Sequence, residues 1–368
     1  MKTKEPISIY IHIPFCRRKC FYCDFTSMCN LSLQDRYIDC LVAEAERYLV
    51  KVGDVEVKSV FVGGGTPSVL SPDNIARLFD CIKKFNLLPD CEITVEGNPE
   101  SLDKDKLRCF HANGVNRLSV GLQSVNDDSL KSIGRLHSYK DFLQCLDNAC
   151  NFFDNINADL MIGVDSTFLK FRHTVDTVVK LPLKHLSFYA LEIYPDSELR
   201  RLIDKGRVSV VEDEDILADM YDYACERLAD NGFSRYEVSN FSRQSPCRHN
   251  LNYWQCGEYI GLGVAASGYL NHIRYTNTHS LERYLKGGSV RTDCSYINRQ
   301  ESMREFLMLG LRLEQGISLS DFFNRYGRQL TEVFDISKCK DYLVQDGDAL
   351  RVCNDKFYAL NYILTELL

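Results

Sequence analysis

The first 240 residues alternate short apolar segments with longer amphipathic ones. The amphipathic segment over residues 32–51 places Leu33, Tyr37 and Leu41 at helical spacing, and Ser71 before Pro72 predicts the N-cap of a second helix. The apolar segments have the length of buried strands, and each is followed by a helical pattern. They cover residues 7–13, 59–64, 92–97, 117–121, 158–163 and 186–191.

Six strand–helix units in series predict an α/β fold with a parallel sheet, because parallel strands need long crossover connections. Both faces of the strands look apolar, as expected when helices cover a sheet. Strand count alone fits an open sheet or a curled, partial barrel. The alternation stops near residue 240, so we expect one domain over residues 1–244 and a smaller, mainly helical domain over residues 245–368, with a hairpin near residues 346–348.

Distinctive residues follow four of the predicted strands. A cysteine-rich segment follows the first strand, residues 63–67 (GGGTP) the second, residues 96–99 (EGNP) the third, and Gln123 the fourth. Ligands of parallel α/β folds bind at the carboxyl ends of the strands. We therefore expect these residues to gather around one shared mouth.

The cysteine-rich segment has the spacing of metal ligands. Cys16, Cys20 and Cys23 form a C-x3-C-x2-C pattern, which could hold three irons of a 4Fe–4S cubane and leave the fourth iron open. The alternative is zinc, with His12 or Asp24 as the fourth ligand. Zinc motifs usually consist of two separated pairs, and no second pair lies nearby, so the spacing favours the cluster.

Composition narrows the class of protein. The chain has 368 residues, 45% of them hydrophobic and 26% charged, which is typical of globular domains. A net charge of −7 gives no basic field for nucleic acid or anionic lipid, and no apolar run approaches the roughly 20 residues of a membrane helix. Most of the 16 cysteines are scattered singly. We expect a cytoplasmic protein with small ligands.

Two motifs in this order resemble the radical SAM superfamily: C-x3-C-x2-C after a first strand, and GGGTP after the second. Six motifs together resemble the HemW haem chaperones, relatives of the oxygen-independent coproporphyrinogen III oxidases (HemN). This resemblance covers nearly the whole chain and implies a partial (β/α)6-type barrel with a HemN-type C-terminal domain. The motifs are IHIPFCRRKCFYCDF (11–25), GGGTPS (63–68), RLSVGLQS (117–124), GRLHS (134–138), YEVSNF (236–241) and CRHNLNYW (247–254).

The resemblance implies a set of cofactor-binding residues. The three cysteines would bind the cluster, and the methionine amino and carboxylate groups of S-adenosylmethionine would bind the open iron. Glu96 would accept the ribose hydroxyls, and Arg135 would meet a carboxylate as a fork, although Arg135 and Asp159 could instead form an ordinary ion pair. The residues that the resemblance assigns to S-adenosylmethionine are Tyr10, Tyr22, Gly64, Gly65, Thr66, Glu96, Gln123, Arg135, Asp159 and Ala190.

Two features favour the chaperone over the oxidase. The oxidases carry a further cysteine two residues after the third, where this chain has Phe25, and they have a longer segment before the cluster, where this chain has 15 residues before Cys16. We therefore expect no coproporphyrinogen oxidase activity. A porphyrin-acting radical SAM enzyme is the alternative, because residues 163–168 (GVDSTF) depart from the family's usual Gly-Leu-Pro-Gly-Gln-Thr loop.

The segment His249–Trp254 (HNLNYW) is associated with haem in HemW-like proteins. Physically it offers an imidazole as an axial ligand for iron and aromatic rings for a macrocycle, with Cys247 as a second ligand. The alternative is a hydrogen-bonded anchor that binds nothing. The resemblance implies haem as cargo, a respiratory acceptor protein, and an electron donor if S-adenosylmethionine is cleaved. It is compatible with transient contact with a membrane protein, and nucleic acid is not expected.

Overall fold

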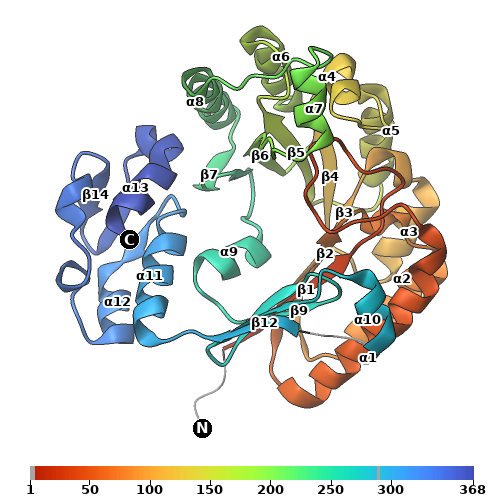
Figure 1. The fold of residues 1–368 in the computed structure, drawn as a ribbon, viewed down its shortest axis with the longest axis horizontal. Helices are drawn as coiled ribbons and strands as arrows, with labels where there is room; N and C mark the ends of the chain where they lie inside the picture. The colour runs from red at the N-terminus through yellow and green to blue at the C-terminus, as the bar shows by residue number, and fades with distance from the viewer. Residues whose placement is uncertain (1–4, 288–290) are drawn as a thin grey trace.

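The computed structural model describes residues 5–287 and 291–368, and its centre is a curved sheet of twelve strands (Figure 1). The six predicted strands form the middle of this sheet, where each pairs in parallel with its neighbours in sequence order. The predicted parallel α/β fold is confirmed. These strands are β1 (Ile7–Ile13), β2 (Val57–Gly64), β3 (Leu87–Gly97), β4 (Arg117–Gln123), β5 (Ile156–Ile162) and β6 (His185–Ala190).

Helices follow each of these strands, and the longer ones pack on the convex side of the sheet (Figure 1). Ser71 caps its helix as expected, because its hydroxyl accepts a hydrogen bond from the N–H of Asn74 at 3.2 Å. None of the described helices is long and apolar enough to cross a bilayer. The helices are α1 (Gln34–Val52), α2 (Pro72–Ile82), α3 (Lys104–Ala112), α4 (Asp127–Ser132), α5 (Tyr139–Ala149), α6 (Phe168–Val178), α7 (Glu198–Asp204) and α8 (Glu214–Asp230).

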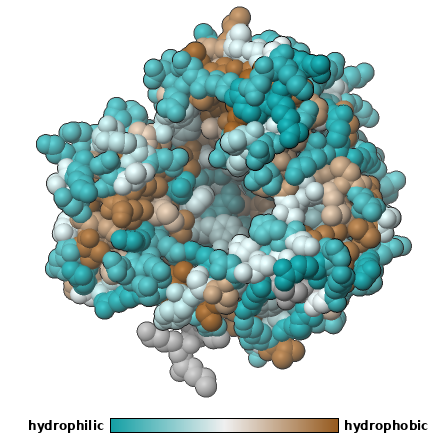
Figure 2. Space-filling view, viewed as in Figure 1, coloured by the Kyte–Doolittle hydropathy of each residue, from teal (hydrophilic) through white to brown (hydrophobic). Residues whose placement is uncertain are grey.

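The two faces of the sheet differ in polarity. In β1 the alternate residues Ile9 and Ile11 are fully buried in the core that includes Tyr37 of α1. Tyr10 and His12 lie on the opposite, concave face, since successive strand residues point to opposite sides. The expectation of two apolar faces is therefore wrong for the concave face. Figure 2 shows the reason: the molecule is hollowed at its centre, and hydrophilic residues line the hollow.

The chain after residue 244 returns to the same sheet. Strand β9 (Tyr259–Leu262) pairs in parallel with β1, and three antiparallel strands extend that edge as far as Tyr296. The expected domain boundary at residue 244 thus falls within the segment that builds both edges of the sheet. The remaining elements of this segment are β7 (Ser234–Glu237), β8 (Asn240–Ser242), α9 (Arg248–Trp254), β10 (Ser267–Leu270), β11 (Ile273–Asn277), α10 (Leu281–Gly287) and β12 (Arg291–Tyr296).

A smaller unit follows the sheet and contains three helices with a three-stranded sheet. The expected hairpin at residues 346–348 joins two of its strands. The elements of the unit are α11 (Arg299–Gly310), β13 (Ile317–Ser318), α12 (Leu319–Tyr326), β14 (Leu343–Asp346), β15 (Ala349–Val352) and α13 (Leu360–Leu367). Short 3-10 helices along the chain are η1 (Leu31–Leu33), η2 (Pro67–Val69), η3 (Pro99–Ser101), η4 (Leu330–Glu332), η5 (Ile336–Cys339) and η6 (Asn354–Ala359).

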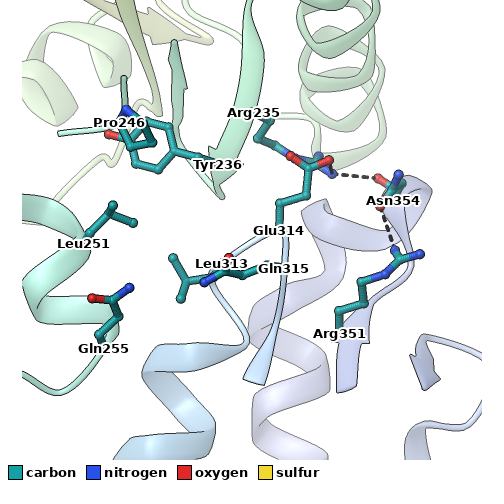
Figure 3. A pocket seen from close by; sticks show the side chains of 10 residues that line it. All are labelled: Arg235, Tyr236, Pro246, Leu251, Gln255, Leu313, Glu314, Gln315, Arg351 and Asn354. Atoms are coloured by element: carbon teal, nitrogen blue, oxygen red, sulfur yellow. Dashed lines mark hydrogen bonds and ion pairs between the residues drawn. The ribbon is translucent and has the colours of Figure 1, made fainter. Parts of the chain in front are cut away.

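Backbone hydrogen bonds attach the smaller unit to the edge of the main sheet. The N–H of Val238 donates to the carbonyl of Arg312 at 2.9 Å, and the N–H of Glu314 donates to that of Tyr236 at 3.1 Å. A cavity of about 470 Å³ lies beside this junction, between α9 and the smaller unit (Figure 3). In it Arg351 donates to the side chain of Asn354 at 3.0 Å.

Candidate cluster and cofactor site

The three cysteines of the C-x3-C-x2-C pattern lie on one closed loop, residues 14–30, at the carboxyl end of β1. Its ends are joined because the N–H of Met28 donates to the carbonyl of Pro14 at 2.8 Å and the N–H of Cys16 to that of Met28 at 2.9 Å. Cys16 is buried and Cys20 and Cys23 are half-buried, and all three thiols are free. The loop therefore presents its thiols from a fixed frame.

A second contact holds this cysteine loop against residues 133–135. The guanidinium of Arg18 donates to the carbonyl of Gly134 at 2.6 Å and to that of Arg135 at 2.9 Å. The N–H of Phe21 donates to the carbonyl of Ile133 at 3.0 Å. The Arg18 side chain thus ties the start of the GRLHS motif to the cysteine loop, and a backbone hydrogen bond ties the residue before it.

Two donors point at the cysteine sulfurs. The hydroxyl of Thr66 lies 3.5 Å from Sγ of Cys16, and Nη1 of Arg135 lies 3.6 Å from Sγ of Cys20. Burial raises the pKa of the Cys16 and Cys23 thiols, whereas iron binds thiolates. Donors and a cation beside the sulfurs offset this cost and are the outer partners that tune iron–sulfur clusters.

The three thiols are not gathered around one point in the described part of the chain. Across residues 5–287 and 291–368, no three His, Cys, Asp or Glu side chains converge as the ligands of one ion would. In a 4Fe–4S cubane each cysteine binds a different iron, so the three sulfurs lie further apart than the ligands of one metal ion. Three free thiols on one loop, with donors beside two of them, are a ligand set that could hold three irons of such a cubane.

The glycines after β2 allow two backbone segments to approach closely. A Cβ on Gly65 would lie 2.8 Å from the carbonyl oxygen of Phe15, and Gly64 has a φ of +109°. The N–H of Gly65 donates to the carbonyl of Ile13 at 2.8 Å, and the N–H of Thr66 to that of Phe15 at 2.8 Å. The predicted residues Gly64, Gly65 and Thr66 therefore lie directly against the cysteine loop.

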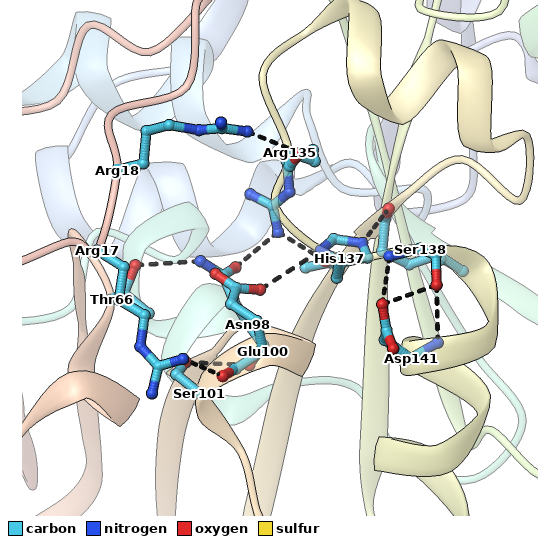
Figure 4. A network of polar contacts seen from close by, with 12 residues as sticks. Arg17, Arg18, Thr66, Asn98, Glu100, Ser101, Arg135, His137, Ser138 and Asp141 are labelled. Carbon is cyan, nitrogen blue, oxygen red and sulfur yellow. Dashed lines mark hydrogen bonds and ion pairs between the residues drawn. The ribbon is translucent and has the colours of Figure 1, made fainter.

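A polar network connects the predicted residues Thr66 and Arg135 (Figure 4). Asn98 is its centre: its Nδ2 donates to the Thr66 hydroxyl at 3.1 Å, and its Oδ1 accepts from Arg135 at 2.6 Å. Arg135 also donates to the carbonyl of Gly121 at 2.7 Å. The sequence interpretation gave Asn98 no role, although it lies in the EGNP segment that was singled out.

Two carboxyl groups share the concave face of the sheet. Glu96 accepts from the N–H of Gly64 at 3.1 Å, and burial together with the nearby Asp159 raises its pKa to about 8. Asp159 accepts from Ser119 at 3.1 Å and Asn157 at 2.7 Å, and burial raises its pKa. Arg135 and Asp159 thus have different partners, so their pairing as an ion pair is wrong. Both carboxyl groups can accept hydroxyl groups of a ligand in the hollow.

The other predicted residues lie around the same opening. Tyr10 is on the concave face, and its hydroxyl lies 3.1 Å from Nδ1 of His12. Tyr22 packs on a separate apolar cluster that includes Leu199. Gln123 ends β4 with a φ of +72°, a strained conformation typical of functional sites. Ala190 is exposed at the end of β6.

The unusual loop of residues 163–168 has a structural anchor. The carboxylate of Asp165 is fully buried and accepts hydrogen bonds from Ser124 at 2.7 Å, Thr174 at 2.8 Å and Asn126 at 2.9 Å. These bonds bind the loop to the start of α4 and to α6. Although its sequence differs from that of the family's loop, this loop is thus held in place by the hydrogen bonds of Asp165.

His249 lies at the opposite end of the strands from the cysteines. Its Nδ1 lies 3.0 Å from the hydroxyl of Ser59, near the start of β2, and its Nε2 lies 2.9 Å from the hydroxyl of Tyr253. Five residues of strand separate Ser59 from Gly64, which is roughly 16 Å. Burial and nearby positive charge lower the pKa of His249 to about 3. Both ring nitrogens are engaged, so the geometry agrees with the anchor rather than with an axial ligand.

Glu92 explains how the segment with His249 is held. Its carboxylate accepts from the N–H groups of Arg248 and His249, each at 3.1 Å, and contacts Sγ of Cys247 at 3.3 Å. These groups form the amino end of α9, which therefore closes the hollow at the amino ends of the strands. Cys247 is fully buried, and its pKa is raised to about 12. No sequence pattern indicates this cap, because Glu92 stands in its strand like any other polar strand residue.

Two family models and several named proteins are similar to this chain. A family model described as the radical SAM superfamily matches residues 10–178, and one described as the HemN C-terminal domain matches residues 297–352. The protein named heme chaperone HemW from Bacillus subtilis is 36% identical over 89% of this chain and 89% of its own length. The chain belongs to the HemW family of radical SAM proteins. This superfamily implies a 4Fe–4S cluster and S-adenosylmethionine, and the free thiols of the cysteine loop, with donors beside two of them, fit the cluster.

Two further relatives extend the comparison. The mouse protein named radical S-adenosyl methionine domain-containing protein 1, mitochondrial, is 35% identical over 92% of this chain and 81% of its own length. The solved structure of coproporphyrinogen III oxidase (HemN) from Escherichia coli has a TM-score of 0.85, covering 99% of this chain and 90% of that one at 20% identity. At that identity the likeness establishes the fold. It confirms the radical SAM and HemN architecture expected for the whole chain.

Proposed function

We propose that this protein is a haem chaperone that works in the cytoplasm and passes haem to an acceptor protein. The observation that carries the proposal is the 36% identity to a named haem chaperone over 89% of both chains. The free cysteines support a reducing compartment, since the described residues contain no disulfide. The acceptor would be a respiratory protein.

The residues of this chain would divide the work of the cofactor site. Cys16, Cys20 and Cys23 would hold the cluster, which supplies one-electron chemistry and an open iron when bound. Glu96 would bind ribose hydroxyls, and the backbone around Gly64 would approach the methionine amine. Arg135 would fix the cofactor carboxylate while donating to the Cys20 sulfur.

Phe25 separates this proposal from the oxidase alternative. It occupies the position where the oxidases carry an additional cysteine, and its side chain is 64% exposed beside the cysteine loop. A phenylalanine cannot supply a thiol for chemistry or for iron. We therefore propose that the protein keeps the cofactor site of the oxidases, but binds and transfers haem instead of converting a porphyrin substrate.

The test is an anaerobic titration of ferric haem into cluster-reconstituted protein, followed by mixing with an apo-haemoprotein. The proposal predicts a saturable Soret band at one haem per chain, transfer of that haem, and no protoporphyrinogen when coproporphyrinogen III is supplied with S-adenosylmethionine and a reductant. Protoporphyrinogen formation without stable haem binding would favour the oxidase. Absence of any specific haem binding would overturn the proposal.

A further inference from the structure

A second cavity lies beside the cysteine loop and is not used by the residues assigned to the cluster or to S-adenosylmethionine, except for Tyr10. Its volume is about 590 Å³, within the range of roughly 300 to 1,000 Å³ for small-molecule sites. We call it the β1–β10 groove, because it runs along these strands between the cysteine loop and α9. It is lined by Tyr10, His12, Asp24, Phe25, Thr26, Tyr253, Tyr259, Ala265, Ser267 and His279.

Aromatic side chains dominate the walls of the β1–β10 groove. Tyr253 and Tyr259 meet edge to face at one end, with ring centroids 4.6 Å apart, and Tyr10 forms part of the wall from β1. At the other end lies Phe25, which is 64% exposed. The exposed ring of Phe25 has few apolar neighbours. A flat hydrophobic ligand in the groove could pack against it and remove it from water.

The groove contains two histidines, and their hydrogen bonds differ. Both ring nitrogens of His12 are engaged, one with Tyr10 at 3.1 Å and one with the carbonyl of Thr26 at 2.9 Å. His279 is exposed, and its Nδ1 lies 3.1 Å from the hydroxyl of Thr26. Its Nε2 has no hydrogen-bond partner among the described residues. When Nδ1 donates to Thr26, Nε2 presents its lone pair.

This is the arrangement that iron-binding histidines share. A ligating imidazole usually donates its other N–H to a neighbouring oxygen, which fixes the tautomer and the direction of the ring. Thr26 takes this place when Nδ1 of His279 carries the proton, and Thr26 belongs to the cysteine loop. The free nitrogen of His279 is therefore oriented by the same segment that presents the cysteines.

We propose that haem binds in the β1–β10 groove, with Nε2 of His279 as an axial ligand and Phe25 packed on the porphyrin. The proposal rests on the proposed function as a haem chaperone and names the site of the cargo. It places haem beside the cysteine loop, in a cavity that shares Tyr10 with the residues assigned to S-adenosylmethionine. His249 then acts as a positioning residue that holds Tyr253 in the groove wall through their 2.9 Å contact.

The charges around the groove direct the carboxylates of the porphyrin. Asp24 lines the groove and disfavours propionates on its side. Lys19 is exposed, and its ammonium is held 3.2 Å from the carbonyl of Phe25, at the rim of the groove. A propionate that leaves the groove past Phe25 would meet this cation.

The test is ferric haem titration of cluster-reconstituted protein, read by the Soret band and by the low-temperature electron paramagnetic resonance of the haem. His279→Ala should lose the histidine-ligand signature and bind haem at least tenfold more weakly, and added imidazole should restore the signature. His173→Ala, which removes an exposed histidine from α6, should match the unchanged protein. His249→Ala should keep the ligand signature.

The outcomes separate this proposal from the proposed function. If the unchanged protein binds one haem and His279→Ala binds it with the same spectrum and affinity, the groove proposal is wrong and the chaperone proposal stands. If folded His249→Ala loses the ligand signature while His279→Ala keeps it, the site is at α9 instead. If the unchanged protein binds no haem, the proposed function itself fails.

Discussion

Replacing Glu96 by Gln should change how the stability of the ligand-free protein depends on pH. The carboxyl group of Glu96 lies on the concave face of the sheet, where burial and the neighbouring Asp159 raise its pKa from 4.5 to about 8. Because its pKa is raised in the folded state, its contribution to stability is present in full below pH 4.5. That contribution is lost as the pH rises to about 8.

The size of the effect follows from the two pKa values. The difference between 4.5 and about 8 corresponds to ~5 kcal/mol, at 1.36 kcal/mol per pKa unit. The Glu96 side chain is only half-buried, because it faces the hollow. Water in the hollow screens its charge and reduces this free-energy difference. We therefore compare the unfolding free energy of Glu96→Gln with that of the unchanged protein. This difference should rise by about 2 to 3 kcal/mol in favour of the variant when the pH is raised from 5 to 8.5.

The assay is urea unfolding at several pH values, followed by the fluorescence of Trp254, the one tryptophan of the chain. Glu100→Gln is a suitable control. Although burial opposes it, hydrogen bonding to His137 and the charge of Arg135 leave the pKa of Glu100 lowered. The contribution of Glu100 is present above its unfolded pKa and is lost only at lower pH, so its variant should show no such gain. Equal pH dependence of Glu96→Gln and the unchanged protein would refute the reasoning.

Three further substitutions test the site and its supports. Cys20→Ser should abolish iron binding while the far-ultraviolet circular dichroism stays unchanged, and a brown sample with full iron content would contradict the ligand set. Arg135→Lys replaces a guanidinium, whose Nη1 and Nη2 contact Cys20 and Asn98 separately, by a single ammonium that cannot meet a carboxylate as a fork, so S-adenosylmethionine should bind at least tenfold more weakly by calorimetry on reconstituted protein; unchanged affinity would argue against its role. Glu92→Ala leaves the buried N–H of His249 and the part-buried N–H of Arg248 unpaired and should cost about 2 to 4 kcal/mol in urea unfolding, with Glu92→Gln costing less; a loss near zero would exclude the cap.

The sequence predicted the parts of the fold that depend on local pattern and on chain order. Six strand–helix units and the gathering of residues 63–67, Glu96 and the cysteines at one end follow from the geometry of parallel sheets. Strand β9 could not be found in this way. It pairs with β1 from some 250 positions further along the chain, and its short YIGL segment carries no signal for that partner.

The concave face shows a different kind of error. In ISIYIHI the polar residues stand at alternate positions, which is the pattern of a strand with one polar face. Tyrosine and histidine are large and partly apolar, so the segment reads as continuously buried. The role of His249 could not be predicted from the sequence for another reason. Its partners, Ser59 and Glu92, lie on strands more than 150 residues earlier in the chain.

The claim on which the account depends is that the cysteine loop holds a 4Fe–4S cluster with one iron open to S-adenosylmethionine. Iron and sulfide analysis with electron paramagnetic resonance of the dithionite-reduced, reconstituted protein tests it directly. The account predicts four irons and four sulfides per chain, and a spectrum that changes when S-adenosylmethionine is added. A colourless protein that contains zinc, or a cluster whose spectrum ignores the cofactor, would contradict it.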